Sequence, residues 1–108
     1  MNYQIVFDED EYINEYEAMG ELMNRIVKTI IDEWDPIDLF PLAPNDEYQN
    51  EIKEIVDFIY KNENTSPLAL AKEINRVFTT RFGADVYEKD VNECLLVAQK
   101  ILLTISAT

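Results

Sequence analysis

The sequence predicts an all-α fold, a compact four-helix bundle-like single domain that covers residues 1–108. Apolar residues recur at steps of three and four along most of the chain, which is the period of a helix with one buried face. Proline, glycine and capping residues divide this pattern into four segments, at approximately 12–34, 46–61, 67–82 and 87–105. Residues 1–10 are predicted to form an extended or loose N-terminal arm, because Tyr3, Ile5 and Phe7 alternate with other residues.

The first helix is predicted to end near Trp34. Pro36 disfavours the helical conformation at Asp35, so the helix cannot continue through this position. We expect Trp34 to pack together with Ile37, with Leu39 or Phe40, and with Tyr48, which would lock the turn between the first two helices. Asp35 would cap either the first helix or the following segment, and Pro36 would fix the exit of the chain. The predicted structural motif is therefore Trp34, Asp35, Pro36 and Tyr48.

The next two helices have clear start signals. Asn45 is a good N-cap for the second helix, and Ser66 followed by Pro67 marks the start of the third. Gly83 is predicted to end the third helix in a left-handed conformation. The buried stripe of the second helix should consist of Tyr48, Ile52, Ile55, Val56 and Ile59.

The fourth helix has the broadest apolar surface. Asp85 and Glu88 resemble a capping box at its start. Leu96, Val97 and Leu103 extend its apolar surface well beyond one face. Two explanations follow: either this helix is central in the bundle, with the second helix also deeply buried, or part of it contacts a second copy in a homodimer.

Composition excludes most catalytic chemistry. The chain has no histidine and a single cysteine, Cys94, which we expect to be a buried small hydrophobic residue. Without an imidazole base or a cysteine cluster, neither catalytic triads nor zinc sites can be built. The isolated Gly20 and Gly83 do not form a phosphate-binding loop. We therefore expect no enzyme activity, no catalytic residue, no cofactor-binding residue and no metal ligand.

One enzymatic alternative is a magnesium-dependent all-α nucleotide pyrophosphohydrolase. Those enzymes hold Mg²⁺ between paired carboxylates at positions i and i+3 of two helices. Glu51 with Glu54 provides one such pair, and Asp90 with Glu93 an inexact second one. The helical phase argues against this alternative, because Glu54 falls on the polar side of its helix.

The formal charge of −13 has two interpretations, a solvated surface that keeps the protein soluble or a surface that attracts a basic protein partner. It opposes binding to nucleic acid or to an anionic membrane, and the absence of a signal peptide or a spanning segment predicts a cytoplasmic location. The predicted partner-binding residues are the acids of the first two helices, taken to be exposed: Glu17, Glu21, Glu47, Glu51 and Glu54. Lys72, Arg76 and Arg81 should instead pair with acids on neighbouring helices.

The segment Trp34-Asp35-Pro36-Ile37, followed by Asp46-Glu47-Tyr48 and Glu51-Ile52, resembles the YugE-like proteins. These are small acidic proteins of Gram-positive bacteria that form a domain of unknown function. The resemblance continues through Ser66-Pro67 and the apolar last helix, and it implies an all-helical fold without an assigned activity. A looser similarity links the same motifs to small immunity proteins that neutralise secreted bacterial toxins. This second similarity favours a non-catalytic binding or inhibitory protein.

Overall fold

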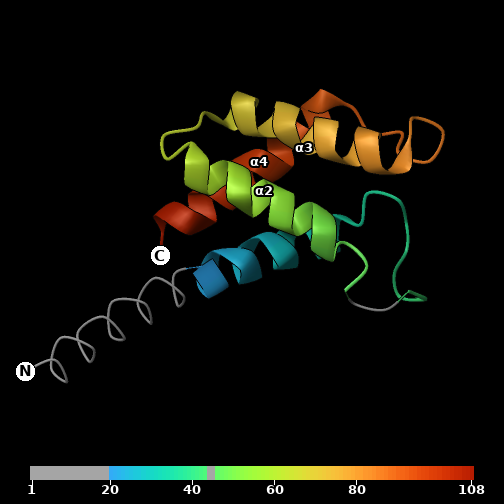
Figure 1. Ribbon diagram of the computed structural model, residues 1–108, viewed down its shortest axis with the longest axis horizontal. Helices are drawn as coiled ribbons and strands as arrows, with labels where there is room; N and C mark the ends of the chain where they lie inside the picture. The colour runs from blue at the N-terminus through green and yellow to red at the C-terminus, as the bar shows by residue number, and fades with distance from the viewer. Residues whose placement is uncertain (1–19, 44–45) are drawn as a thin grey trace, which may run out of the picture.

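The computed structural model describes residues 20–43 and 46–108 and shows an all-α fold of four packed helices (Figure 1). The described part of the first helix covers residues 20–34. It is followed by α2 (Gln49–Lys61), α3 (Pro67–Phe82) and α4 (Val91–Ser106), and the described residues contain no strand. The predicted arm at 1–10 and the predicted helical residues 12–19 lie outside the described part of the chain.

Helix α3 begins and ends where the sequence predicts. The side chain of Ser66 accepts a hydrogen bond of 3.1 Å from the backbone N–H of Ala69, and Pro67 occupies the first helical position. Gly83 follows the helix with a φ of 81°, and its N–H donates to the carbonyl of Thr79 at 2.9 Å. A side chain would be strained in this conformation, so glycine allows the abrupt stop.

Helix α2 begins at Gln49, three residues later than predicted, and its N-cap is Tyr48. Residues 46–48 form a turn instead, closed by a 3.1 Å hydrogen bond from the N–H of Gln49 to the carbonyl of Asp46. The predicted N-cap, Asn45, lies outside the described residues. The Tyr48 side chain is buried and directed to the linker that precedes it, which explains why the helix starts only after it.

Helix α4 begins at Val91, not at 87, and the predicted capping box of Asp85 and Glu88 is wrong. Asp90 is the N-cap, and its side chain accepts a hydrogen bond of 3.0 Å from the N–H of Glu93. The preceding loop is held by the N–H of Tyr87, which donates to the carbonyl of Gly83 at 2.9 Å. This loop buries Tyr87, a side chain that a helix starting at 87 would carry out of the core.

The predicted apolar stripes form the core. All five predicted residues of the α2 stripe are buried, and α3 contributes Leu70, Ala71, Ile74, Val77 and Phe78. Among the three labelled helices, α3 packs against both α2 and α4. Leu96 and Leu103 of α4 remain exposed.

Phe78 of α3 is the centre of an aromatic cluster that joins the linker to the core. Trp34 packs edge-on against Phe78, with ring centroids 5.7 Å apart, and against Tyr87 at 6.3 Å. Tyr48 packs edge-on against Phe78 at 5.8 Å and against Phe40 at 5.7 Å. The predicted linker packing is thus present, but Trp34 and Tyr48 meet through Phe78, which sequence reasoning had not included.

We predict that Trp34→Ala lowers the free energy of unfolding by about 3 kcal/mol, because it removes an indole that packs edge-on against both Phe78 and Tyr87. Urea unfolding followed by circular dichroism measures this loss. Leu42→Ala is the matched control: Leu42 belongs to the same linker but is 97% exposed, so this variant should unfold with the wild-type midpoint. An unchanged midpoint for Trp34→Ala would show that the indole contributes nothing to the core.

Candidate functional site

The predicted partner-binding acids do not form one surface. Glu21 and Glu47 are exposed, as expected, whereas Glu17 lies outside the described residues. Glu51 was predicted to be exposed, but it is only 2% exposed, and Glu54 is partly buried. Both carboxylates face α3, where they meet arginine side chains. They therefore belong to the packing between two helices and not to a free acidic face.

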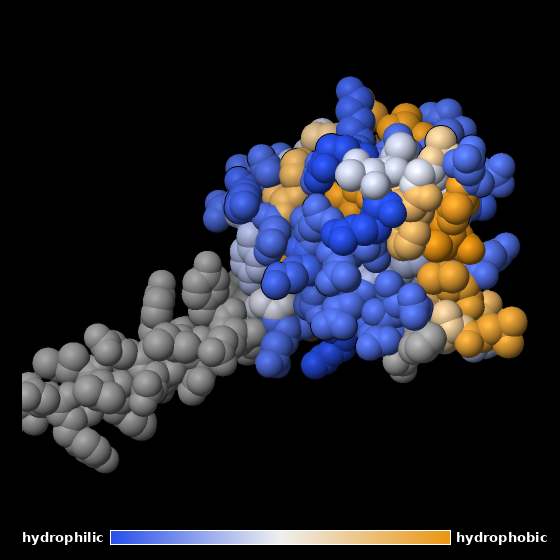
Figure 2. All heavy atoms as spheres, turned by 45° about the vertical axis from the view of Figure 1, so that its right-hand side comes forward, coloured by the Kyte–Doolittle hydropathy of each residue, from blue (hydrophilic) through white to orange (hydrophobic). Residues whose placement is uncertain are grey.

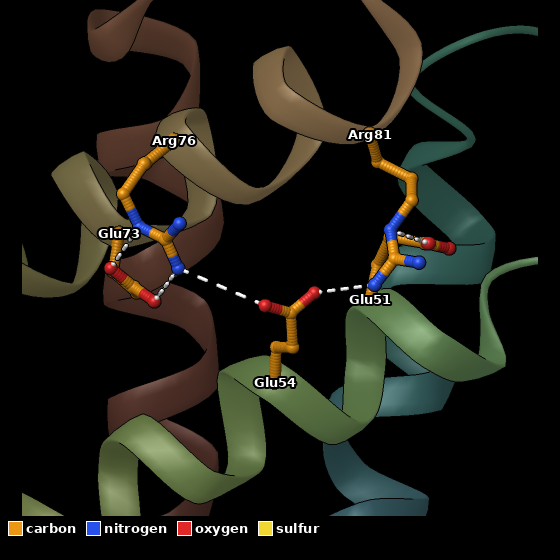
Figure 3. Close-up of polar contacts among 5 residues, drawn as sticks. All are labelled: Glu51, Glu54, Glu73, Arg76 and Arg81. Atoms are coloured by element: carbon orange, nitrogen blue, oxygen red, sulfur yellow. Dashed lines mark hydrogen bonds and ion pairs between the residues drawn. The ribbon is translucent and has the colours of Figure 1, made fainter.

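A row of alternating charges joins α2 to α3 (Figure 3). Arg81 lies between two carboxylates, with its Nε 3.1 Å from Oε2 of Glu51 and its Nη2 2.7 Å from Oε2 of Glu54. The other oxygen of Glu54 is 3.8 Å from Nη2 of Arg76. Arg76 in turn makes two hydrogen bonds to Glu73, at 2.9 and 2.6 Å. The prediction that these arginines pair with neighbouring acids is confirmed.

Glu51 is the buried end of this row. Burial raises its pKa, and the positive charge of Arg81 only partly opposes that rise. Its Oε1 atom is buried and has no hydrogen-bond partner, while Oε2 faces Arg81. Burying an ionised carboxylate costs free energy, and with one charged neighbour the stability of the ionised form depends strongly on that neighbour. Arg81 therefore keeps the α2–α3 interface compatible with an ionised Glu51.

The carboxylates considered for the magnesium alternative are engaged in other contacts. Glu51 and Glu54 are ion-paired with Arg81, and Asp90 caps α4. Within the described residues, no group of three or more carboxylate, cysteine or histidine side chains is arranged to hold a metal ion. The thiol of Cys94 is also inaccessible, since it is buried with its Sγ 2.9 Å from Oη of Tyr87. Burial raises the pKa of both the Cys94 thiol and the Tyr87 hydroxyl.

Asp35 organises the linker between the first helix and α2. Its Oδ1 accepts hydrogen bonds from the Oη of Tyr48 at 2.5 Å and from the N–H of Leu39 at 2.8 Å. Its Oδ2 accepts a third, at 3.0 Å, from the N–H of Phe40. Of the two capping roles that the sequence left open for Asp35, the structure selects the second, because the carboxylate caps the segment after it.

The ionised form of Asp35 is favoured by these contacts. Burial pushes its pKa upward, but the hydrogen bonds from Tyr48, Leu39 and Phe40 outweigh it, so the net pKa is lowered. The same environment raises the pKa of Tyr48, first through burial and then through its hydrogen bond to Asp35. Asp35 has a φ of 46° and Asp38 one of 56°. Aspartate tolerates this left-handed region better than most residues, which makes the sharp linker turns possible.

One end of the bundle carries an exposed apolar surface on its two connections. We call it the linker pole and define it by the described linker residues 35–43 and 46–48 together with the α3–α4 loop, residues 83–90. Leu42 is 97% exposed and Val86 is also exposed. Tyr48 joins the two connections, because its ring packs against Phe40 of the linker and against Phe82 at the end of α3. Figure 2, turned to bring this end forward, shows hydrophobic surface beside hydrophilic surface along its right-hand edge.

The linker pole is also rich in exposed acids. The linker pole holds one base, Lys89, and its exposed carboxylates are Asp38, Asp46, Glu47, Asp85, Glu88 and Asp90. Only Glu47 among them was a predicted binding residue. The sequence does contain a signal for this acidic surface, because residues 35–48 include no lysine or arginine. The linker and the α3–α4 loop are, however, 35 or more positions apart in the chain. Only the fold brings them to the same end.

The comparisons with known proteins give a family without an activity. The family model described as Domain of unknown function (DUF1871) matches residues 25–107, which include α2, α3, α4 and residues 25–34 of the first helix. No curated protein and no solved structure matches the chain. In the part of the chain that the structure describes, none of the helices has the length and apolar character needed to cross a membrane.

We predict that Arg81→Met destabilises the protein at about pH 7, because it leaves Glu51 buried without its cation. Arg81 is partly exposed, which keeps the loss below that of a fully buried pair. The pKa of Glu51 is raised on folding, so the cost of its charge falls as the pH drops through that pKa. Urea unfolding should therefore show a smaller loss at about pH 4.5 than at about pH 7.

Glu51→Gln provides the control for this prediction. The double variant Glu51→Gln/Arg81→Met lacks the stranded charge, so it should be more stable at about pH 7 than Arg81→Met alone. Equal losses for Arg81→Met at both pH values, with no recovery in the double variant, would show that Glu51 is not the group that Arg81 compensates.

Proposed function

Since the chain belongs to the family described as a domain of unknown function (DUF1871), its function must be inferred from its own surface, and we propose that it is a non-catalytic protein that binds a basic protein partner. The binding surface in this proposal is the linker pole. The observation that carries it is Leu42, which is almost fully exposed on a linker that Asp35 and Tyr48 hold in one conformation.

A rigid, exposed leucine is a favourable anchor for binding. Burial of an exposed leucine side chain contributes a favourable free energy to binding, and a surface that is already ordered loses little entropy on association. Leu39 and Phe40 precede Leu42 in the linker and are partly buried against the core. The backbone N–H groups of both residues donate hydrogen bonds to the carboxylate of Asp35. The linker thus presents Leu42 without having to reorganise.

The acids around Leu42 indicate the charge of the partner. A rim of one sign attracts a partner of the opposite sign and speeds its encounter, more than it adds to final affinity. The partner should therefore have a basic rim around an apolar pocket. This chemistry suits an inhibitor of a basic protein, as the looser similarity to immunity proteins implies. Glu51 and Glu54, assigned to the binding surface from the sequence, have no part in this proposal because Arg81 neutralises them.

We also propose that the chain is one of the YugE-like proteins. The motifs that carry this resemblance, from Trp34-Asp35-Pro36 to the last helix, lie within the matched residues 25–107. The Asp35–Tyr48 hydrogen bond supports the choice of these motifs, since it joins the two halves of the pattern that the resemblance rests on.

Affinity capture from cells of the native host tests the binding proposal. At about 50 mM salt the immobilised chain should recover a basic protein, and at about 500 mM salt it should lose it through screening. Asp85→Lys/Glu88→Lys reverses two charges of the linker pole and should abolish recovery, and Leu42→Ala should weaken it. The matched control is Asp57→Lys/Glu63→Lys, which makes the same charge change at exposed positions toward the other end of α2.

Equal recovery of the partner by the linker-pole variant and by the control variant would contradict the proposed surface. Magnesium-dependent release of pyrophosphate from nucleoside triphosphates by the purified chain would contradict the proposed class of function.

A further inference from the structure

The solvent-facing side of α4 is a second apolar surface, separate from the linker pole. Leu96 is 67% exposed and Leu103 is 71% exposed, although both are large hydrophobic residues on one helix. They are seven positions apart, so they lie on the same side of the helix, about 10 Å from one another along its axis. Beside Leu103 a groove of about 420 Å³ runs between the start of α3 and the end of α4, lined by Pro67, Gln99, Leu102, Leu103 and Ser106.

This face has almost no net charge in a chain whose formal charge is −13. The exposed residues of α4 are Asn92, Leu96, Gln99, Lys100, Leu103, Thr104 and Ser106, and its one carboxylate is Glu93. The two charged side chains of α4 are both ion-paired, Glu93 with Lys89 at 4.0 Å and Lys100 with Glu33 of the first helix at 3.2 Å. This face therefore attracts a basic partner less than the linker pole does. The face is instead the surface on which two copies of an acidic protein can approach with the least repulsion.

We infer that a second copy of this chain docks on this face, with the two α4 helices antiparallel about a two-fold axis. Leu96 and Leu103 are equally distant from the point between Gln99 and Lys100. An axis at that point brings Leu96 of each copy against Leu103 of the other, so the surface is complementary to itself. The two Gln99 side chains, which can both donate and accept hydrogen bonds, then lie near the axis.

The size and charge of the α4 face set the properties of this dimer. One pair of helices covers less than the approximately 800 Å² per partner of a standard stable interface, so we expect a weak dimer. Because the acids lie outside the contact, they only repel one another at a distance, and salt screens that repulsion. The dimer should therefore strengthen as salt rises, whereas binding of a basic partner at the linker pole should weaken. The inference does not depend on the proposed function.

Sedimentation equilibrium of the full chain tests the inference at concentrations up to about 500 µM and at about 50 and 500 mM salt. The wild type should shift from monomer toward dimer with concentration, with a larger dimer fraction at high salt. Leu103→Glu places a carboxylate against Leu96 of the other copy and should weaken the dimer at least about tenfold. Leu103→Gln should weaken it too, which separates the loss of apolar contact from added charge.

Leu42→Glu is the matched control, because it adds the same charge at an exposed leucine of the linker pole and should leave the α4 dimer in place. These variants replace exposed side chains, and circular dichroism verifies their helix content. A wild-type chain that remains monomeric at about 500 µM would overturn the inference. A dimer that Leu42→Glu dissolves and that both Leu103 variants retain would overturn it as well.

Discussion

The hydrogen bonds that Asp35 accepts hold together three parts of the molecule. Two come from the backbone of the linker, and the third comes from Tyr48, the residue from which α2 starts. Tyr48 is fully buried and packs against Phe78 of α3. A single carboxylate at the end of the first helix thus relates that helix to α2 and α3. The position of Leu42 on the outside, and the shape of the linker pole, follow from the same constraint.

The distribution of charge divides the molecule into surfaces with different properties. Where α2 meets α3, the acids Glu51, Glu54 and Glu73 are ion-paired with two arginines, Arg76 and Arg81, so most of their charge is compensated within the packing. At the linker pole the exposed acids have a single base among them. On α4 the exposed Leu96 and Leu103 form an apolar surface, and the two charged side chains of the helix are ion-paired. The net charge of −13 therefore does not act evenly, and each surface favours a different neighbour.

Periodicity and caps predicted the helices well, because each depends on neighbours within one or two turns. Ser66, Pro67 and Gly83 set the limits of α3 locally, and the α2 stripe is buried as expected. The starts of α2 and α4 were misplaced because Tyr48 and Tyr87 are bound by contacts far along the chain, with Asp35 and with the Trp34–Phe78 pair. The exposure of Glu51 was misjudged for the same reason, since Arg81 lies thirty positions away. Sequence reasoning found Glu47 but not the loop acids that the fold places near it.

A double-mutant cycle between Asp35 and Tyr48 tests the organising role of this hydrogen bond most directly. Urea unfolding of the wild type, Asp35→Ala, Tyr48→Phe and the double variant gives the coupling free energy, in which the strain of alanine at a positive φ cancels. We expect a coupling of about 1–2 kcal/mol, as for a partly buried hydrogen bond to a charged group. A coupling within error of zero would show that the two residues stabilise the fold independently and would contradict the account.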